Sequence, residues 1–157
     1  MRLLVIAVGQ RQPARAESAW ADYARRFPSE LRLELEAVKT EPRLGGKPVA
    51  ALKAAEAQRI AAALPRGARR GVLDERGLRA STAELAARLA GCWRAEGRDV
   101  ALLVGGPDGL ADEPRSGADE TLRLSDLTLP HALARVLLAE ALYRAWSLLV
   151  GRPYRRE

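Results

Sequence analysis

Residues 102–110 of this chain, LLVGGPDGL, join a strongly apolar run to a glycine-rich turn. The apolar run covers residues 99–105, and a similar one covers residues 2–9, which is typical of strands buried on both faces of a mostly parallel sheet. In open α/β sheets, ligands bind at the carboxyl ends of the strands, where glycines let the backbone approach them closely. The stretch therefore predicts an α/β fold with a ligand site at this turn. A plain turn leaving a strand is the alternative.

The rest of the chain continues the α/β pattern. Residues 31–38 alternate apolar and charged side chains, as in an edge or half-exposed strand, and Ser81 and Glu84 form an S-x-x-E capping box. The periodicities predict strands at residues 2–9, 31–38, 70–74 and 99–105 and helices at residues 13–27, 48–64, 82–95 and 132–150. We expect one domain over residues 1–157, in which a mostly parallel sheet is flanked by helices and a loop-rich segment precedes the last helix.

The composition is that of a folded and basic protein. Apolar residues make up 48% of the chain, charged residues 29%, and the formal net charge is +6. The positive charge favours a polyanionic partner, nucleic acid first. Cys92 is the only cysteine and His131 the only histidine, so one chain has neither a disulfide framework nor a His/Cys metal cluster. We expect no metal and a reducing, cytoplasmic location.

Residues 131–150 are long enough to be tested as a membrane span, but His131, Arg135, Glu140 and Arg144 are each costly in hydrocarbon. We therefore expect a buried helix and no membrane contact. Because apolar residues occupy most of its circumference, this helix needs cover on both sides. The sheet would cover one side and a second subunit the other, which predicts a homodimer. A core helix in a monomer is the alternative.

Residues 124–131, LSDLTLPH, lead into the last helix with small polar groups and a proline suited to a first helical turn. They form either a ligand-binding loop or simply a capped helix start. His131 lies where the helix dipole disfavours its protonated form, so we expect a neutral imidazole.

The C-terminal tail places Tyr154 before Arg155 and Arg156. An aromatic ring followed by two arginines suits base stacking and phosphate contact on single-stranded or looped RNA. A solvated terminus without function is the alternative.

Taken together, these segments resemble one family. The runs LVGGPDGL and LSDLTLPHALARVLLAEALYRAWS and the terminal RPYRRE are similar to those of the RlmH-type enzymes of the SPOUT class. The runs RLLVIAVG and ADYARRFP extend the resemblance over essentially the full length. It implies a homodimer that uses S-adenosylmethionine to methylate N3 of a pseudouridine in a stem-loop of bacterial 23S ribosomal RNA, on the assembled ribosome. It also implies a C-terminal trefoil knot, an exception to the rule that chains are unknotted.

The resemblance also implies roles for individual residues. The cofactor-binding residues would be Leu73, Gly105, Gly106, Ser125, Asp126, Leu127, Thr128, Leu129 and Pro130. The catalytic residues would be Arg156, Tyr154 and His131, and the RNA-binding residues would be Arg144 and Arg155. The tail would reach the active site across the dimer. Asp108 stands where the family has Glu, a shortening that a turn should tolerate. Arg155 stands where the family often has His, so a tail histidine cannot serve as general base here.

The implied reaction depends mainly on aligning the target nitrogen with the methyl–sulfur axis, which lowers a barrier by up to about 7–11 kcal/mol. We expect arginines to stabilise the N3 anion electrostatically, and we rank this above a dedicated base such as His131. Two other functions stay open: a non-enzymatic module that binds RNA or the ribosome, and a SPOUT methyltransferase acting on transfer RNA.

Overall fold

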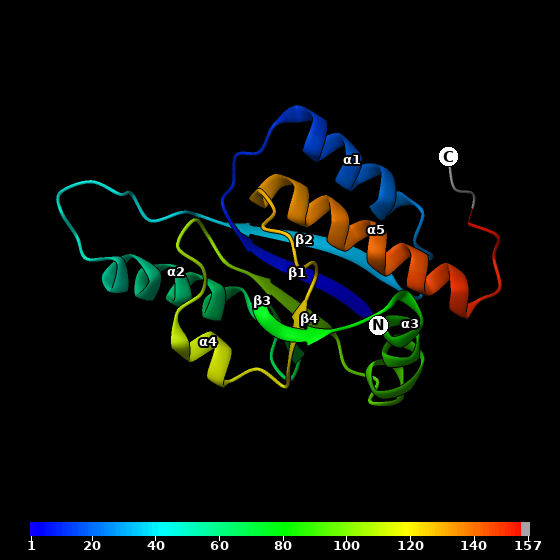
Figure 1. The fold of residues 1–157 in the computed structure, drawn as a ribbon. Helices are drawn as coiled ribbons and strands as arrows, with labels where there is room; N and C mark the ends of the chain where they lie inside the picture. The colour runs from blue at the N-terminus through cyan, green and yellow to red at the C-terminus, as the bar shows by residue number, and fades with distance from the viewer. Residues whose placement is uncertain (155–157) are drawn as a thin grey trace.

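The computed structural model describes residues 1–154 and shows a sheet between two layers of helices (Figure 1). The strands are β1 (Arg2–Val8), β2 (Arg32–Val38), β3 (Arg69–Arg79), β4 (Val100–Val104) and β5 (Glu120–Arg123). The helices are α1 (Ala14–Arg25), α2 (Val49–Ala63), α3 (Thr82–Arg88), α4 (Asp112–Ser116) and α5 (His131–Leu149), with a π-helical turn, η1 (Leu89–Trp93), after α3. All strands of the sheet are parallel, in the order β2-β1-β4-β3-β5. The predicted α/β class is confirmed.

The core lies on both faces of the sheet, as the apolar runs predict. Successive side chains of a strand point to opposite faces, so β1 contributes to two clusters. Leu3 and Val5 pack with residues of α1, η1 and α5, whereas Leu4 and Ile6 pack with Ile60 of α2. Full burial of one such side chain stabilises the fold by about 1.5–3 kcal/mol. Packing on both faces holds the central strands β1 and β4 in place. The end of β4 thereby fixes the position of the glycine-rich turn that follows it.

Two local predictions are confirmed. The alternating strand β2 forms an edge of the sheet, with Leu33 buried and Glu36 exposed. The capping box at the start of α3 is complete: Ser81 Oγ accepts the N–H of Glu84 at 3.1 Å, and the Glu84 carboxylate accepts the N–H of Ser81 at 2.7 Å.

The structure differs from the predicted elements after β4 and within one helix. The expected loop-rich segment contains the short elements α4 and β5. Strand β3 continues to Arg79 instead of ending at residue 74, with an irregularity between Leu73 and Leu78. The predicted helix at residues 82–95 changes to the π-helical turn η1 because Gly91 (φ −87°, ψ −106°) leaves helical geometry.

Strand β5 is held by contacts that are distant in sequence. The side chain of its residue Glu120 is 6% exposed, and its carboxylate accepts hydrogen bonds from Trp93 Nε1 at 2.6 Å and from Arg88 Nη1 at 2.5 Å. A buried carboxylate needs such partners. A run of four residues with a single buried leucine does not predict a strand from the sequence. The partners that stabilise β5 lie on α3 and η1, far away in the sequence.

Helix α5 begins at the end of the molecule that carries the loop between β2 and α2, and the C-terminal tail lies at the other end (Figure 1). Within residues 1–154, no helix combines the length and the apolar character needed to cross a membrane. The trefoil knot stays a prediction.

Candidate active site

The turn after β4 reverses the chain within residues 105–109. Gly109 has a positive φ of 81° and donates its N–H to the carbonyl oxygen of Gly106 at 3.0 Å. A Cβ atom on Gly105 would lie 2.6 Å from the carbonyl carbon of Gly109, and one on Gly106 would lie 2.9 Å from Val8 Cγ1. The turn therefore requires glycine at all three positions.

The loop before α5, residues 124–130, is held by local polar contacts. Ser125 Oγ accepts the N–H of Leu127 at 2.9 Å. The Asp126 carboxylate pairs with Arg123 at 2.9 Å and with Arg79 at 3.3 Å. Leu127 is 76% exposed. Local hydrogen bonds and ion pairs thus hold the shape of the loop. The exposed Leu127 side chain can contact a ligand or a second molecule.

The third segment is the end of the regular part of β3, where Asp74 follows Leu73. The Asp74 side chain is 7% exposed and pairs with Arg115 of α4 at 2.8 Å. Sequence reasoning missed both residues. Asp74 could have been found, because it directly follows an apolar strand, but nothing in the sequence joins it to an arginine in a segment expected to be irregular.

These three segments surround a cavity of about 440 Å³. Small-molecule and cofactor sites typically measure about 300–1,000 Å³. The predicted site residues that line it are Leu73, Gly105, Gly106, Ser125, Asp126, Leu127, Thr128, Leu129 and His131. Pro130 is not among the lining residues and instead precedes α5 as its N-terminal cap.

The chemistry of the cavity fits S-adenosylmethionine. Leu73, Leu127 and Leu129 provide apolar surface suited to the faces of an adenine, and the glycine turn provides backbone polar groups. The binding roles of the individual residues stay predictions.

His131 is the first residue of α5 and lies at the cavity. Burial, followed by the charge of Arg135, lowers its pKa below 6.5, while Glu56 acts weakly in the opposite direction. The imidazole is therefore neutral at pH 7, as the sequence predicts. Arg135 is itself buried and donates through Nη2 to the carbonyl oxygens of Val8 at 2.9 Å and Gly9 at 2.7 Å. It ties the start of α5 to the end of β1.

A larger cavity of about 550 Å³ lies between α1, β2 and the start of α5. Trp20, Leu33 and Leu35 give it a largely apolar lining, and Arg135 is among its polar lining residues. Its lining residues come from α1, β2, α5 and Gln12, and none of those described belongs to the glycine turn or to the loop before α5. We therefore take the smaller cavity, where the three segments meet, as the candidate active site.

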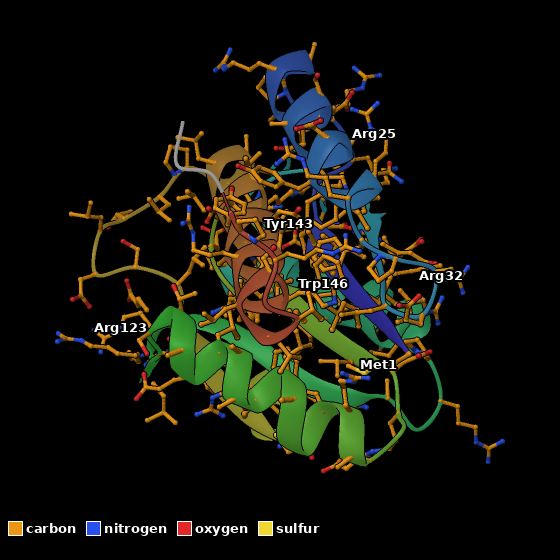
Figure 2. All side chains as sticks on the ribbon, turned by 90° about the vertical axis from the view of Figure 1, so that its right-hand side faces the viewer. Met1, Arg25, Arg32, Arg123, Tyr143 and Trp146 are labelled. Carbon is orange, nitrogen blue, oxygen red and sulfur yellow. The ribbon has the colours of Figure 1, made fainter. Side chains whose placement is uncertain are left out.

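The structure does not bring the predicted RNA-contacting residues to the cavity of the same chain. The Tyr154 ring lies 5.4 Å from that of Tyr143, and Arg144 Cζ lies 4.2 Å from the centre of the Tyr154 ring. At 1.5 Å per residue, α5 separates Tyr143 from His131 by about 18 Å. Figure 2 likewise shows Tyr143 well apart from Arg123, which lines the cavity. Arg155 and Arg156 lie outside the described residues.

A parallel α/β sheet with a cofactor-sized cavity at the carboxyl ends of its strands defines a class of ligand-binding enzyme folds. The model of the family described as "Predicted SPOUT methyltransferase" matches residues 1–155, and the chain belongs to this family. Among its relatives are the ribosomal RNA large subunit methyltransferases H of Leptothrix cholodnii and Methylibium petroleiphilum. They are 70% and 68% identical to this chain, and each alignment covers 100% of both proteins.

Solved structures give the same fold. A structure that concerns the 2-OH methylation of C/U34 on tRNA has a TM-score of 0.52 at 22% identity, covering 96% of this chain and 98% of the other. TrmJ from Z. mobilis has a TM-score of 0.52 at 18% identity, covering 98% of this chain and 72% of the other. These identities support the fold alone. Family membership confirms the predicted SPOUT methyltransferase class and S-adenosylmethionine as its cofactor.

Proposed function

We propose that this chain transfers a methyl group from S-adenosylmethionine to N3 of a pseudouridine in a stem-loop of large-subunit ribosomal RNA. The observation that carries the proposal is the 70% identity over the full length to a relative named ribosomal RNA large subunit methyltransferase H. The net charge of +6 supports a polyanionic substrate. The choice of pseudouridine, of N3 and of the assembled ribosome follows from the resemblance to RlmH-type enzymes.

The protein's own contribution is positioning. S-adenosylmethionine supplies a methyl group already activated on a positively charged sulfur. In the proposed site, Leu73, Leu127 and Leu129 would pack against the adenine, and the backbone of the glycine turn would contact its polar edge. Holding two reactants in line in this way contributes up to about 7–11 kcal/mol to lowering a barrier.

The N3 imide must lose its proton, which can pass to solvent water, and a cation would stabilise the resulting anion. Arg115 and Arg123 line the cavity, but Asp74 and Asp126 already pair with them at 2.8 and 2.9 Å. The lowered pKa of His131 makes it a weak base. These observations support a stabilising arginine from outside the cavity, and we propose Arg156 of a second copy for this role.

A homodimer would bring that tail to the cavity, and one face of α5 suits an interface. Leu133, Leu137 and Leu148 are 51%, 41% and 56% exposed, and their spacing places them on one side of the helix. Arg144, paired with Glu140, falls on the same side. An exposed apolar stripe of this kind is typical of a protein–protein contact. Tyr154 lies against Arg144, so the tail begins at this face.

Mass spectrometry of RNA from strains with and without this protein tests the proposal. We expect one methyl group on a pseudouridine of large-subunit ribosomal RNA to disappear in the deletion strain. Purified protein should restore it on assembled ribosomes. Unchanged ribosomal RNA would refute the proposed substrate, and a methyl group lost from transfer RNA would identify the alternative one.

A further inference from the structure

The loop between β2 and α2, residues 39–48, lies against the glycine turn, and the functions above do not use it. Arg43 is the residue that makes this contact. Its Nη1 donates to the carbonyl oxygen of Glu41 at 2.6 Å and to Glu56 Oε2 at 2.7 Å, and its Nη2 donates to Asp108 Oδ2 at 2.9 Å. Because Asp108 belongs to the glycine turn, Arg43 joins that turn to α2. We call these contacts the Arg43 bridge.

Glu56 is the fixed end of the Arg43 bridge. It lies on α2, is 2% exposed, and its Oε2 also accepts the N–H of Glu41 at 3.1 Å. A Cβ atom on Gly106 would lie 3.1 Å from Glu56 Oε1, so the carboxylate stands directly behind the glycine turn. A buried carboxylate requires a cation and hydrogen bonds, and Arg43 together with the Glu41 N–H provides them.

Compensating the charge of Glu56 does not by itself require a contact with Asp108. The planar guanidinium presents several donors in a fixed fork. Here Nη1 and Nη2 donate to the two carboxylate oxygens of Glu56 at 2.7 and 3.4 Å, and Nη2 also reaches Asp108 of the turn at 2.9 Å. The hydrogen bond to Glu56, together with that to Asp108, raises the pKa of Arg43 despite its partial burial. The bridge therefore stays charged, and it ties an exposed part of the turn to a buried anchor.

We propose that Arg43 is a positioning residue for the cofactor site, where it holds the glycine turn against α2 in the geometry that binds S-adenosylmethionine. This inference rests on the proposed function, since it concerns the same site. A turn held in its binding geometry loses less freedom when the ligand binds, and affinity improves accordingly. Breaking the bridge should therefore raise KM for S-adenosylmethionine much more than it lowers kcat at saturating cofactor.

The same loop contains a matched contact that does not reach the turn. Arg59 of α2 donates to Glu41 Oε2 at 2.5 Å and to the carbonyl oxygen of Lys39 at 3.1 Å. The substitution Arg59→Ala therefore loosens the loop from α2 and leaves the contact between Arg43 and Asp108 in place. It separates the effect of general loop disorder from that of the Arg43 bridge.

The test is calorimetry of full-length protein with S-adenosylhomocysteine, supported by methyl-transfer kinetics. Asp108→Ala removes the turn's end of the bridge without disturbing the pairing of Arg43 with Glu56. We expect Asp108→Ala and Arg43→Ala to raise Kd about tenfold, whereas Arg59→Ala and the carboxylate-preserving Asp108→Glu stay within about threefold of the parent. Where Arg43→Ala fails to fold because Glu56 loses its partner, Asp108→Ala carries the test.

Each outcome separates this inference from the proposed function. A parent protein that does not bind S-adenosylhomocysteine contradicts the proposed function itself. If the parent binds but Asp108→Ala binds equally tightly, the inference about Arg43 is wrong while the proposed function stands. The inference is also wrong if Arg59→Ala weakens binding as much as Asp108→Ala, because loop disorder then explains both effects.

Discussion

Gly105 is the residue at which the candidate site leaves the least space. A Cβ atom there would lie 2.6 Å from a backbone carbon of Gly109 and 2.8 Å from the N–H nitrogen of Leu110. Backbone cannot move aside as a side chain can. We expect Gly105→Ala to open the turn, to abolish measurable binding of S-adenosylhomocysteine, and to lower the free energy of unfolding by about 1–3 kcal/mol. Calorimetry and denaturant unfolding measure the two effects.

Gly67 provides the control for that substitution. It has a positive φ of 76°, lies in the turn between α2 and β3, and a Cβ atom added to it would meet nothing within 4 Å. Gly67→Ala should cost about 1–2 kcal/mol from backbone strain alone and should leave cofactor binding intact. Normal binding by Gly105→Ala would show that the glycine turn is not the cofactor site.

His131 and Arg156 are proposed for different tasks, and their substitutions should differ in effect. His131 is neutral and has a lowered pKa, so we expect it to hold the cofactor loop. Single-turnover methyl transfer by His131→Ala should stay within a few-fold of the parent, whereas Arg156→Ala should lose most activity because the anion loses its stabilising charge.

The pH profile of the single-turnover rate distinguishes a base from a structural residue. A catalytic His131 would give the parent an acid limb that disappears in His131→Ala. The reverse pattern, with His131→Ala inactive and Arg156→Ala active, would overturn the electrostatic mechanism and identify the imidazole as the base.

Helix α5 carries the proposed interface between subunits. Leu137 is 41% exposed and lies between Leu133 and Leu148 on the same face. Placing a carboxylate there would require its desolvation in a dimer, so Leu137→Glu should convert the dimer to monomers and should reduce methyl transfer in parallel. Sedimentation velocity measures the oligomeric state.

Leu44→Glu is a matched control for the interface. Leu44 is 77% exposed and lies on the loop between β2 and α2. The same change of chemistry there should leave the sedimentation coefficient unaltered. A monomeric parent would contradict the proposed dimer. A Leu137→Glu variant that remains dimeric would show that the subunit contact lies elsewhere.

Elements with a local signature were predictable from the sequence, and elements that depend on distant partners were not. The apolar runs of β1 and β4 and the capping box of α3 act within a few residues, and each is confirmed. Strand β5 depends on β3 beside it and on Trp93 and Arg88, which contact Glu120. Such contacts form only when the chain is folded, so the local pattern at residues 120–123 does not contain them.

The candidate site shows the same division over the whole molecule. Its glycine turn and the loop before α5 could be predicted because each has a recognisable motif, and the structure brings both to one cavity. The pairing of Asp74 with Arg115 and the Arg43 bridge could not, because each joins segments without a shared motif. Tyr154 contacts Arg144 in the C-terminal half of α5, far from the cavity of the same chain, and this distance supports the proposal that the tail acts in another copy.

If the tail acts across the proposed dimer, the length of α5 makes activity depend on the association of two chains. The helix spans 19 residues, about 28 Å, and separates the cavity of each chain from its own tail. A solitary chain could then hold its cofactor and still lack the groups that meet the RNA. Specific activity would rise with enzyme concentration through the range in which subunits associate. Newly made chains would be inactive until they dimerise.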